Sequence, residues 1–210
     1  MANSLVDPGI QIPLPNDKTV HVFRDDMEQN VDGVLQLLKV EVPALSVWAN
    51  FAVQYFQLGN DEAALNVLSE ADKVAAQSGD SKGKALLLIA RGSYHTEQYR
   101  KSKEENKSAE IIDGHFNKAN ECFSQATTLM QDEIQSLEED SEVIWVAKGY
   151  LALFSSKNNY RTAREAFNAA MDVTQNKSYA ANLGLGNIQF LQGDFKAAAR
   201  TYVKVLKLYP

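Results

Sequence analysis

The chain has 210 residues, of which 45% are apolar and 23% charged, so collagen-like and disordered compositions are excluded. A formal net charge of -6 without a basic stripe argues against direct nucleic-acid binding. The longest apolar run, 85–90, is too short for a membrane span, no secretory pattern opens the chain, and the single Cys122 forms no internal disulfide. We therefore expect a soluble intracellular protein.

The first part of the chain differs in pattern from the rest. Four of the five prolines lie within residues 1–43. Segments 10–15 and 19–23 alternate in polarity like extended strands, and segment 31–39 has the apolar spacing of a short amphipathic helix. We expect residues 1–42 to form a small N-terminal module, an extended arm followed by a helix.

The remainder, 43–210, repeats itself. No proline interrupts 44–209, and the pattern Ala-x3-large apolar-x2-small recurs four times. The copies are Ala64/Leu68/Ala71, Ala119/Phe123/Ala126, Ala163/Phe167/Ala170 and Ala198/Tyr202/Val205. This pattern is typical of the second helix of a tetratricopeptide repeat. It predicts an all-α solenoid of four helical hairpins, at about 45–78, 82–131, 142–175 and 179–210.

The spacing of the repeats is uneven. The first alanines of successive copies are 55, 44 and 35 residues apart, whereas a regular repeat has about 34 residues. The sequence therefore predicts insertions near 100–115 and 131–141, and segment 100–108 can extend the first helix of repeat two beyond its partner. Gly149 and Gly186 are small where the two helices of a hairpin approach most closely.

Catalytic and metal-binding patterns are absent from the sequence. The three histidines, His21, His95 and His115, show no metal-ligand spacing, and residues 26–33 lack the acidic residue that completes a calcium loop. A helix N-terminus explains that stretch better. The mixed charges of 101–107 indicate a solvated helical face, with contact to an acidic partner as the alternative. We expect no catalysis, no cofactor and no metal.

Stacked repeats create a concave surface that binds other polypeptides. Here its inward positions are mainly apolar and aromatic, without the Lys and Asn pattern of co-chaperones that grip a C-terminal carboxylate. The proposed groove residues are Val53, Phe56, Tyr150, Leu153, Phe154, Asn187, Phe190 and Leu191. We expect this groove to bury an apolar segment of a partner. For each of these residues, packing against a neighbouring repeat or the N-terminal arm is an equal alternative.

Four segments carry a more specific resemblance. They are Ile10-Gln-Ile-Pro-Leu14, Val34-x-x-Leu-Leu-Lys39, Leu45-x-x-Trp48 and Tyr55-Phe-Gln-Leu-Gly59. Together they resemble the start of the large tetratricopeptide scaffold subunit of the Paf complex, an RNA polymerase II-associated elongation complex. The resemblance extends across all 210 residues, including the irregular second repeat.

This resemblance implies a nuclear, non-enzymatic scaffold. Such a protein would hold the namesake subunit of the Paf complex in its groove, contact RNA polymerase II indirectly, and support elongation and co-transcriptional histone modification. It would be part of a longer array, which agrees with the lack of a polar capping helix before Pro210. Two alternatives stay open: a cytosolic tetratricopeptide adaptor or co-chaperone, and the regulatory region of a longer enzyme.

Overall fold

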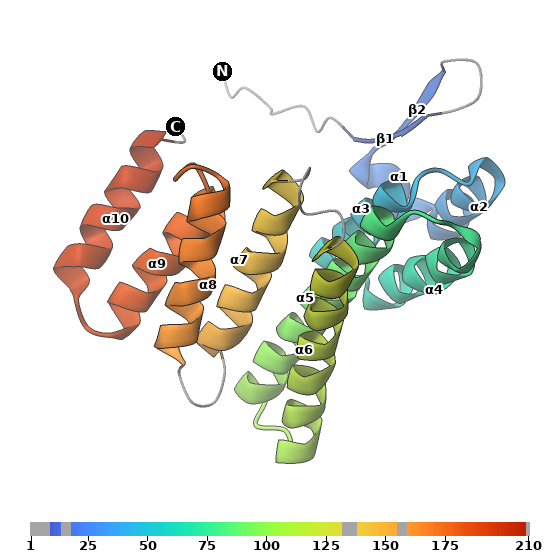
Figure 1. The fold of residues 1–210 in the computed structure, drawn as a ribbon. Helices are drawn as coiled ribbons and strands as arrows, with labels where there is room; N and C mark the ends of the chain where they lie inside the picture. The colour runs from blue at the N-terminus through green and yellow to red at the C-terminus, as the bar shows by residue number, and fades with distance from the viewer. Residues whose placement is uncertain (1–8, 14–17, 132–137, 155–158, 209–210) are drawn as a thin grey trace, which may run out of the picture. The chain divides into compact units, whose positions relative to one another are not determined.

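The computed structural model describes residues 9–13, 18–131, 138–154 and 159–208 (Figure 1). These residues form two strands and ten helices. The elements are β1 (Ile10–Pro13), β2 (Thr19–Val22), α1 (Arg24–Gln29), α2 (Val31–Glu41), α3 (Leu45–Gln57), α4 (Asp61–Gln77), α5 (Ser81–Glu104), α6 (Ala109–Gln131), α7 (Glu138–Phe154), α8 (Tyr160–Val173), α9 (Tyr179–Leu191) and α10 (Phe195–Leu208).

The predicted all-α tetratricopeptide-like architecture is confirmed. Helices pack in consecutive pairs, with α4 on α3, α8 on α7 and α10 on α9. The remaining pair, α5 and α6, comes second in the chain, and its helices lie side by side (Figure 1). The rings of Tyr99 on α5 and Phe116 on α6 are in contact, with centroids 5.6 Å apart. The chain divides into two compact units, residues 1–90 and 91–210, and the division falls within α5.

The first unit combines the N-terminal arm with the first helical hairpin. Strands β1 and β2 pair antiparallel, with Ile10 opposite Val22 and Ile12 opposite Val20. Both Ile12 and Val22 are buried, and they belong to the same hydrophobic cluster as Trp48 of α3. Residues on both sides of the expected boundary after residue 42 therefore share one core.

Two short-range caps shape the chain between the arm and α2. The backbone N–H of Phe23 donates to Asp26 Oδ2 over 2.9 Å at the start of α1, a one-and-a-half-turn helix that the sequence analysis did not anticipate. The backbone N–H of Gly33 donates to Asn30 Oδ1 over 3.0 Å and begins α2. Residues 26–33 thus contain a capped helix N-terminus, as the sequence indicated.

In the second unit, each hairpin has a glycine facing an aromatic ring. A Cβ atom at Gly149 would lie 2.5 Å from Phe167, and one at Gly186 would lie 2.5 Å from Tyr202. These are the close approaches that the small residues predicted. A third pair, Gly92 against Phe123 at 2.5 Å, was not recognised from the sequence.

The second repeat differs from the expectation in one respect. Helix α5 has 24 residues, but its partner α6 has 23, so the prediction that α5 extends beyond its partner is wrong. The inserted residues lengthen both helices because the chain reverses late, through Asn106 at φ 53°. The second predicted insertion falls largely on 132–137, which lie outside the described residues; 138–141 belong to α7.

Candidate protein-binding surface

The two predicted groove residues of the first unit belong to α3. Val53 and Phe56 are half-buried and pack against the hydrophobic cluster of this unit, as do Ile10 and Val20 of the arm. Their apolar area is therefore shared between the protein's own core and solvent. The surroundings of Val53 and Phe56 therefore agree with a role in internal packing at least as well as with partner binding.

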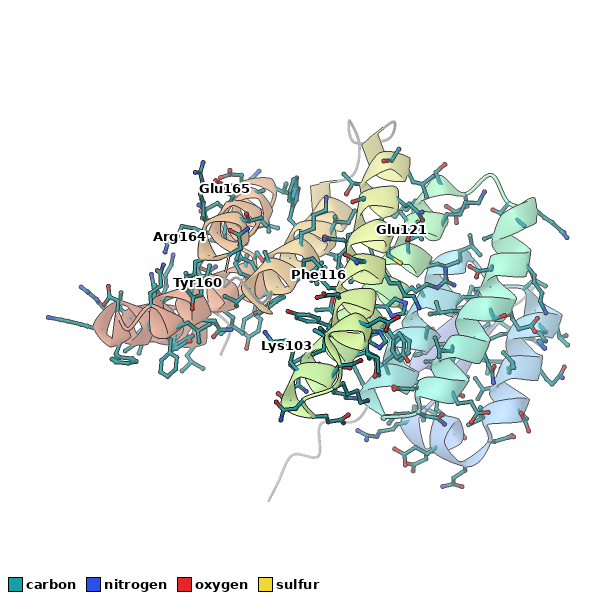
Figure 2. The ribbon with its side chains drawn as sticks, turned by 90° about the horizontal axis from the view of Figure 1, so that it is seen from below. Lys103, Phe116, Glu121, Tyr160, Arg164 and Glu165 are labelled. Carbon is teal, nitrogen blue, oxygen red and sulfur yellow. The ribbon has the colours of Figure 1, made fainter. Side chains whose placement is uncertain are left out.

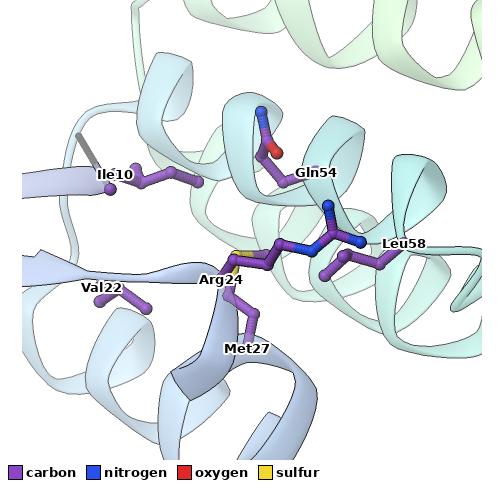
Figure 3. A pocket seen from close by; sticks show the side chains of 7 residues that line it. Ile10, Val22, Arg24, Met27, Gln54 and Leu58 are labelled. Carbon is purple, nitrogen blue, oxygen red and sulfur yellow. The ribbon is translucent and has the colours of Figure 1, made fainter. Parts of the chain in front are cut away.

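A cavity of about 270 Å³ opens beside the arm (Figure 3). Its lining residues are Gly9, Ile10, Val22, Arg24, Met27, Gln54 and Leu58. The guanidinium of Arg24 donates to Glu28 over 2.9 Å. The sequence could not reveal this cavity, because it forms only when the arm folds against α3. Its volume lies just below the range typical of small-molecule sites and suits one or two inserted side chains.

Tyr150 connects two repeats of the second unit. Its hydroxyl donates to the backbone carbonyl of Ala180 over 3.3 Å, and its ring meets the edge of Phe167 with centroids 5.0 Å apart. Burial raises the pKa of the Tyr150 phenol, and the nearby phenols of Tyr179 and Tyr202 raise it further. Tyr150 of α7 is thus half-buried, and its contacts with Phe167 of α8 and Ala180 of α9 fix the orientation of its side chain at the edge of the proposed groove.

Two further groove residues of α7 have different surroundings. Leu153 is 3% exposed and lies in the hydrophobic cluster around Phe167 and Ile188, so its side chain supports the packing of α7, α8 and α9. The side chain of Phe154 lies outside the described residues. In this part of the chain, accessible groove surface therefore comes from Tyr150 rather than from Leu153.

Asn187 lies half-buried on α9. Its Oδ1 accepts a hydrogen bond of 2.8 Å from the hydroxyl of Tyr202 on α10. Burial raises the pKa of the Tyr202 phenol. The bond joins the two helices of the fourth repeat and fixes the orientation of the Asn187 amide.

The most exposed apolar residues among the proposed groove residues lie at the C-terminal end of α9. Phe190 is 53% exposed and Leu191 is 52% exposed. Beside them stands Phe195, at the start of α10, which is 62% exposed and meets the Phe190 ring edge-on with centroids 5.3 Å apart. The sequence analysis did not include Phe195 among the groove residues. Contiguous exposed apolar side chains are typical of interaction sites, whereas single ones are ordinary.

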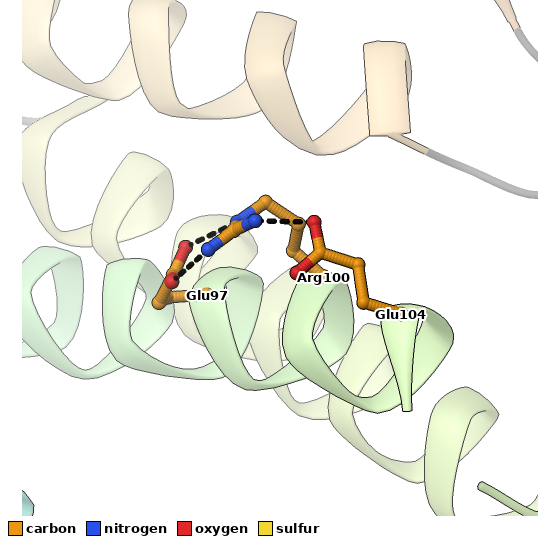
Figure 4. A network of polar contacts seen from close by, with 3 residues as sticks. All are labelled: Glu97, Arg100 and Glu104. Atoms are coloured by element: carbon orange, nitrogen blue, oxygen red, sulfur yellow. Dashed lines mark hydrogen bonds and ion pairs between the residues drawn. The ribbon is translucent and has the colours of Figure 1, made fainter. Parts of the chain in front are cut away.

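Several ion pairs lie along the end of α5 and in the turn that follows it (Figure 4). Arg100 forms a forked ion pair with Glu97, with distances of 2.6 and 2.9 Å, and also pairs with Glu104. Lys107 pairs with Glu105 over 2.8 Å. These contacts agree with a solvated helical face more than with a basic surface awaiting an acidic partner.

Polar and charged side chains also cover other helices of the second unit. Figure 2 shows Arg164 and Glu165 on α8, both exposed. Arg164 donates to Gln192 Oε1 over 2.9 Å, and Arg161 pairs with Glu165 over 2.9 Å. This helix therefore presents a polar surface, in contrast to the apolar end of α9.

Two histidines that looked unrelated in the sequence are in contact. His95 Nδ1 of α5 lies 3.3 Å from His115 Nδ1 of α6. Burial, and to a smaller extent the charges of His115, Lys118 and Arg91 in that order, lower the pKa of His95 to about 4. Among the described residues, no three His, Cys, Asp or Glu side chains are placed to hold a metal ion.

Burial also changes the pKa of Cys122 on α6. It raises the pKa of the buried thiol, which keeps the thiol protonated near neutral pH.

Of the helices in the described segments, none is long and apolar enough to cross a bilayer.

Comparison with known proteins relates the whole chain to one group. No family model matches it. Protein CTR9 homolog of Arabidopsis thaliana is 26% identical over 211 residues, which cover 96% of this chain and 18% of the plant protein. RNA polymerase-associated protein CTR9 of Caenorhabditis elegans is 25% identical over 207 residues, which cover 94% of this chain and 17% of the nematode protein. The chain is similar to CTR9 proteins over nearly its whole length.

The similarity to CTR9 confirms the resemblance to the Paf-complex scaffold subunit that the four N-terminal segments indicated. Because the alignments cover 94% or more of the chain, both compact units take part in the match. The chain spans less than a fifth of the length of these two CTR9 relatives.

Proposed function

We propose that this chain is a protein-interaction module of a CTR9-type scaffold and binds a segment of a partner subunit of the Paf complex. The observation that carries the proposal is the similarity to CTR9 proteins along nearly the whole chain. Tetratricopeptide-like hairpins support it, since stacked helical repeats serve as binding surfaces for other polypeptides.

The accessible binding surface is centred on the end of α9. Phe190 and Leu191 are each about half exposed, and Phe195 extends the same apolar area. Burying one such side chain in full contributes about 1.5–3 kcal/mol, and a few aromatic anchors commonly supply most of the affinity of an interface. Tyr150 and Asn187 supply oriented polar groups, and Val53 and Phe56 are the corresponding candidates in the first unit. Leu153 acts through packing.

In this proposal the protein is nuclear and non-enzymatic and needs no cofactor or metal. Its chief partner is the namesake subunit of the Paf complex, and it reaches RNA polymerase II indirectly. Through this assembly it supports transcription elongation and co-transcriptional histone modification. A net charge of -6 agrees with a protein partner rather than with direct nucleic-acid binding.

Co-expression of the chain with the namesake subunit, followed by size-exclusion chromatography with light scattering, tests the proposal. We expect a stable one-to-one complex. The double substitution Phe190→Ser and Leu191→Ser should weaken it by at least about 30-fold, which corresponds to about 2 kcal/mol. Val203→Ser is the matched control, since Val203 is 49% exposed on α10 and lies outside the proposed groove.

Separate elution of the two proteins, with the chain itself folded and helical, would contradict the partner assignment. An intact complex in the double variant would instead contradict the placement of the surface at the end of α9.

A further inference from the structure

Asn187 places a side-chain amide beside the exposed apolar end of α9. Phe190 and Leu191 follow it by three and four residues on the same helix, so the three side chains share one helix face, with Cβ atoms about 5–6 Å apart. Phe190 and Leu191 are each about half exposed. A segment that packs on these two side chains therefore passes within reach of the Asn187 amide.

The fourth repeat holds this amide in one orientation. Asn187 Oδ1 accepts from the hydroxyl of Tyr202 over 2.8 Å. The ring of Tyr202 lies directly against α9, since a Cβ atom on Gly186 would come within 2.5 Å of Tyr202 Cε1. Because the hydroxyl engages the amide oxygen, both N–H donors of the amide remain for another acceptor. A group that is already held in place loses little conformational entropy when a partner binds.

The amide nitrogen of Asn187 is unpartnered and accessible. It donates to no residue of the described part of the chain. In that part, the fully buried side-chain nitrogen and oxygen atoms without a hydrogen-bond partner are Trp48 Nε1 and the Tyr55 hydroxyl, so the amide nitrogen is open to solvent. A segment that covers the end of α9 displaces water from this donor. The complex must then supply an acceptor or lose affinity.

The surroundings of the amide favour an uncharged acceptor. The side chain bonded to it, Tyr202, and the next ones on its helix face, Phe190 and Leu191, are all uncharged. Covering a carboxylate among such groups is unfavourable, whereas a main-chain carbonyl is neutral and present at every residue. Within a helix, these carbonyls are already bonded to amides four residues further on. An extended segment offers them freely.

We propose that the NH2 group of Asn187 donates to a main-chain carbonyl of the bound partner segment, which is extended where it crosses α9. A neighbouring apolar side chain of the segment packs on Phe190 and Leu191. The second lone pair of Asn187 Oδ1 can accept from a main-chain N–H of the same segment. This inference rests on the proposed function, because it describes the segment bound at the same surface.

Calorimetric titration of the whole chain with the namesake subunit of the Paf complex tests the role of Asn187. Asn187→Asp keeps an oxygen for Tyr202 but replaces the donor with a second oxygen, so it should weaken binding at least about tenfold. Gln189→Glu is the matched control, because Gln189 Oε1 likewise accepts from a hydroxyl of α10, that of Thr201, over 2.8 Å. Residues two apart do not share a helix face, so this control should leave the affinity unchanged.

Nuclear magnetic resonance follows the donor without altering it. Selective isotope labelling of asparagine gives side-chain NH2 signals, and Asn187→Asp assigns the pair from Asn187. We expect this pair to shift to lower field and to exchange more slowly with solvent when the subunit is added. Hydrogen–deuterium exchange identifies the segment of the subunit that the complex protects. An isotope-labelled synthetic copy of that segment should show extended Cα shifts when bound.

Three results would each overturn the inference while leaving the proposed function intact. They are full binding by Asn187→Asp, an Asn187 NH2 pair that saturating subunit does not move, and helical Cα shifts throughout the bound segment. If the unmodified chain does not bind the subunit, the proposed function fails together with the inference. The two failures are therefore distinguishable.

Discussion

Gly184 of α9 lies directly against the ring of Phe167 in α8: a Cβ atom on Gly184 would come within 2.3 Å of Phe167 Cζ. The ring has little room to move aside, because Gly149 of α7 packs against it as well: a Cβ atom there would lie 2.5 Å from Phe167 Cε1. One fully buried phenylalanine thus sets the separation between its own repeat and the next.

This contact predicts that Gly184→Ala destabilises the protein although alanine is the better helix former. Overpacking costs about 1–3 kcal/mol, which outweighs or cancels the gain of about 1 kcal/mol in helix propensity. Gly114→Ala on α6 is the matched control, since a Cβ there meets nothing within 4 Å, and it should stabilise by about 0.5–1 kcal/mol. Urea denaturation measures both; a Gly184→Ala midpoint as high as that of Gly114→Ala would refute the packing argument.

The histidine pair makes stability depend on pH. The folded pKa of His95 is about 4, below its ordinary value of 6.5, so between these values the unfolded chain binds more protons than the folded one. The contribution is complete above pH 6.5 and is lost as the pH falls toward 4. His115 of α6, whose own pKa burial lowers, and the cations Lys118 and Arg91 add to the effect.

Because His95 is half-buried, we expect a loss of about 1–2 kcal/mol between pH 7 and pH 5 after allowance for solvent screening. His95→Gln should remove most of this slope in urea denaturation at the two pH values. His21→Gln, at an exposed position on β2, should keep it. A slope that survives His95→Gln would assign the effect to other groups.

Asn60 caps α4, since its Oδ1 accepts from the backbone N–H of Ala63 over 3.0 Å. Asn60→Ala should therefore lower the free energy of unfolding by about 1 kcal/mol. Asn66→Ala, on an exposed position within the same helix, should be neutral or slightly stabilising. Thermal melts followed by circular dichroism distinguish the two, and equal melting temperatures would argue against the cap.

Tyr150 and Phe190 should respond differently to the same substitution. Tyr150→Asp places a charge in a half-buried site and removes the bond to Ala180, so it should lower the melting temperature. Phe190→Asp changes a residue that is 53% exposed and should leave the melting temperature nearly unchanged while weakening partner binding. Thermal melts followed by circular dichroism measure both variants, and equal melting temperatures would contradict this expectation.

The sequence predicted the repeat hairpins well because their determinants are local. The pattern around Ala163 and Phe167, and the small residue at Gly149, follow from how two adjacent helices must pack. The contact of His95 with His115 follows instead from the register of two helices lengthened by insertion, which repeat spacing does not specify. Gly92 escaped notice for the same reason.

Burial within the candidate surface was also hard to predict. A repeat position says which way a side chain points from its helix, but not how much a neighbouring helix covers it. Leu153 and Phe190 share an apolar character, yet one is 3% exposed and the other 53%. The cavity beside the arm depends on β1 packing against α3, a contact between a strand and a helix that no repeat pattern describes.

Helix α5 belongs to both compact units, since residues 81–90 fall in one and 91–104 in the other. Cutting the chain at this division would remove the amide donors for the last four carbonyls of the shortened helix, those of residues 87–90. The units that compactness defines are therefore not the pieces into which the polypeptide can be dissected. A first-half fragment that ends at Gly79, before α5 begins, or just after Glu104, would respect the hydrogen-bond ladder.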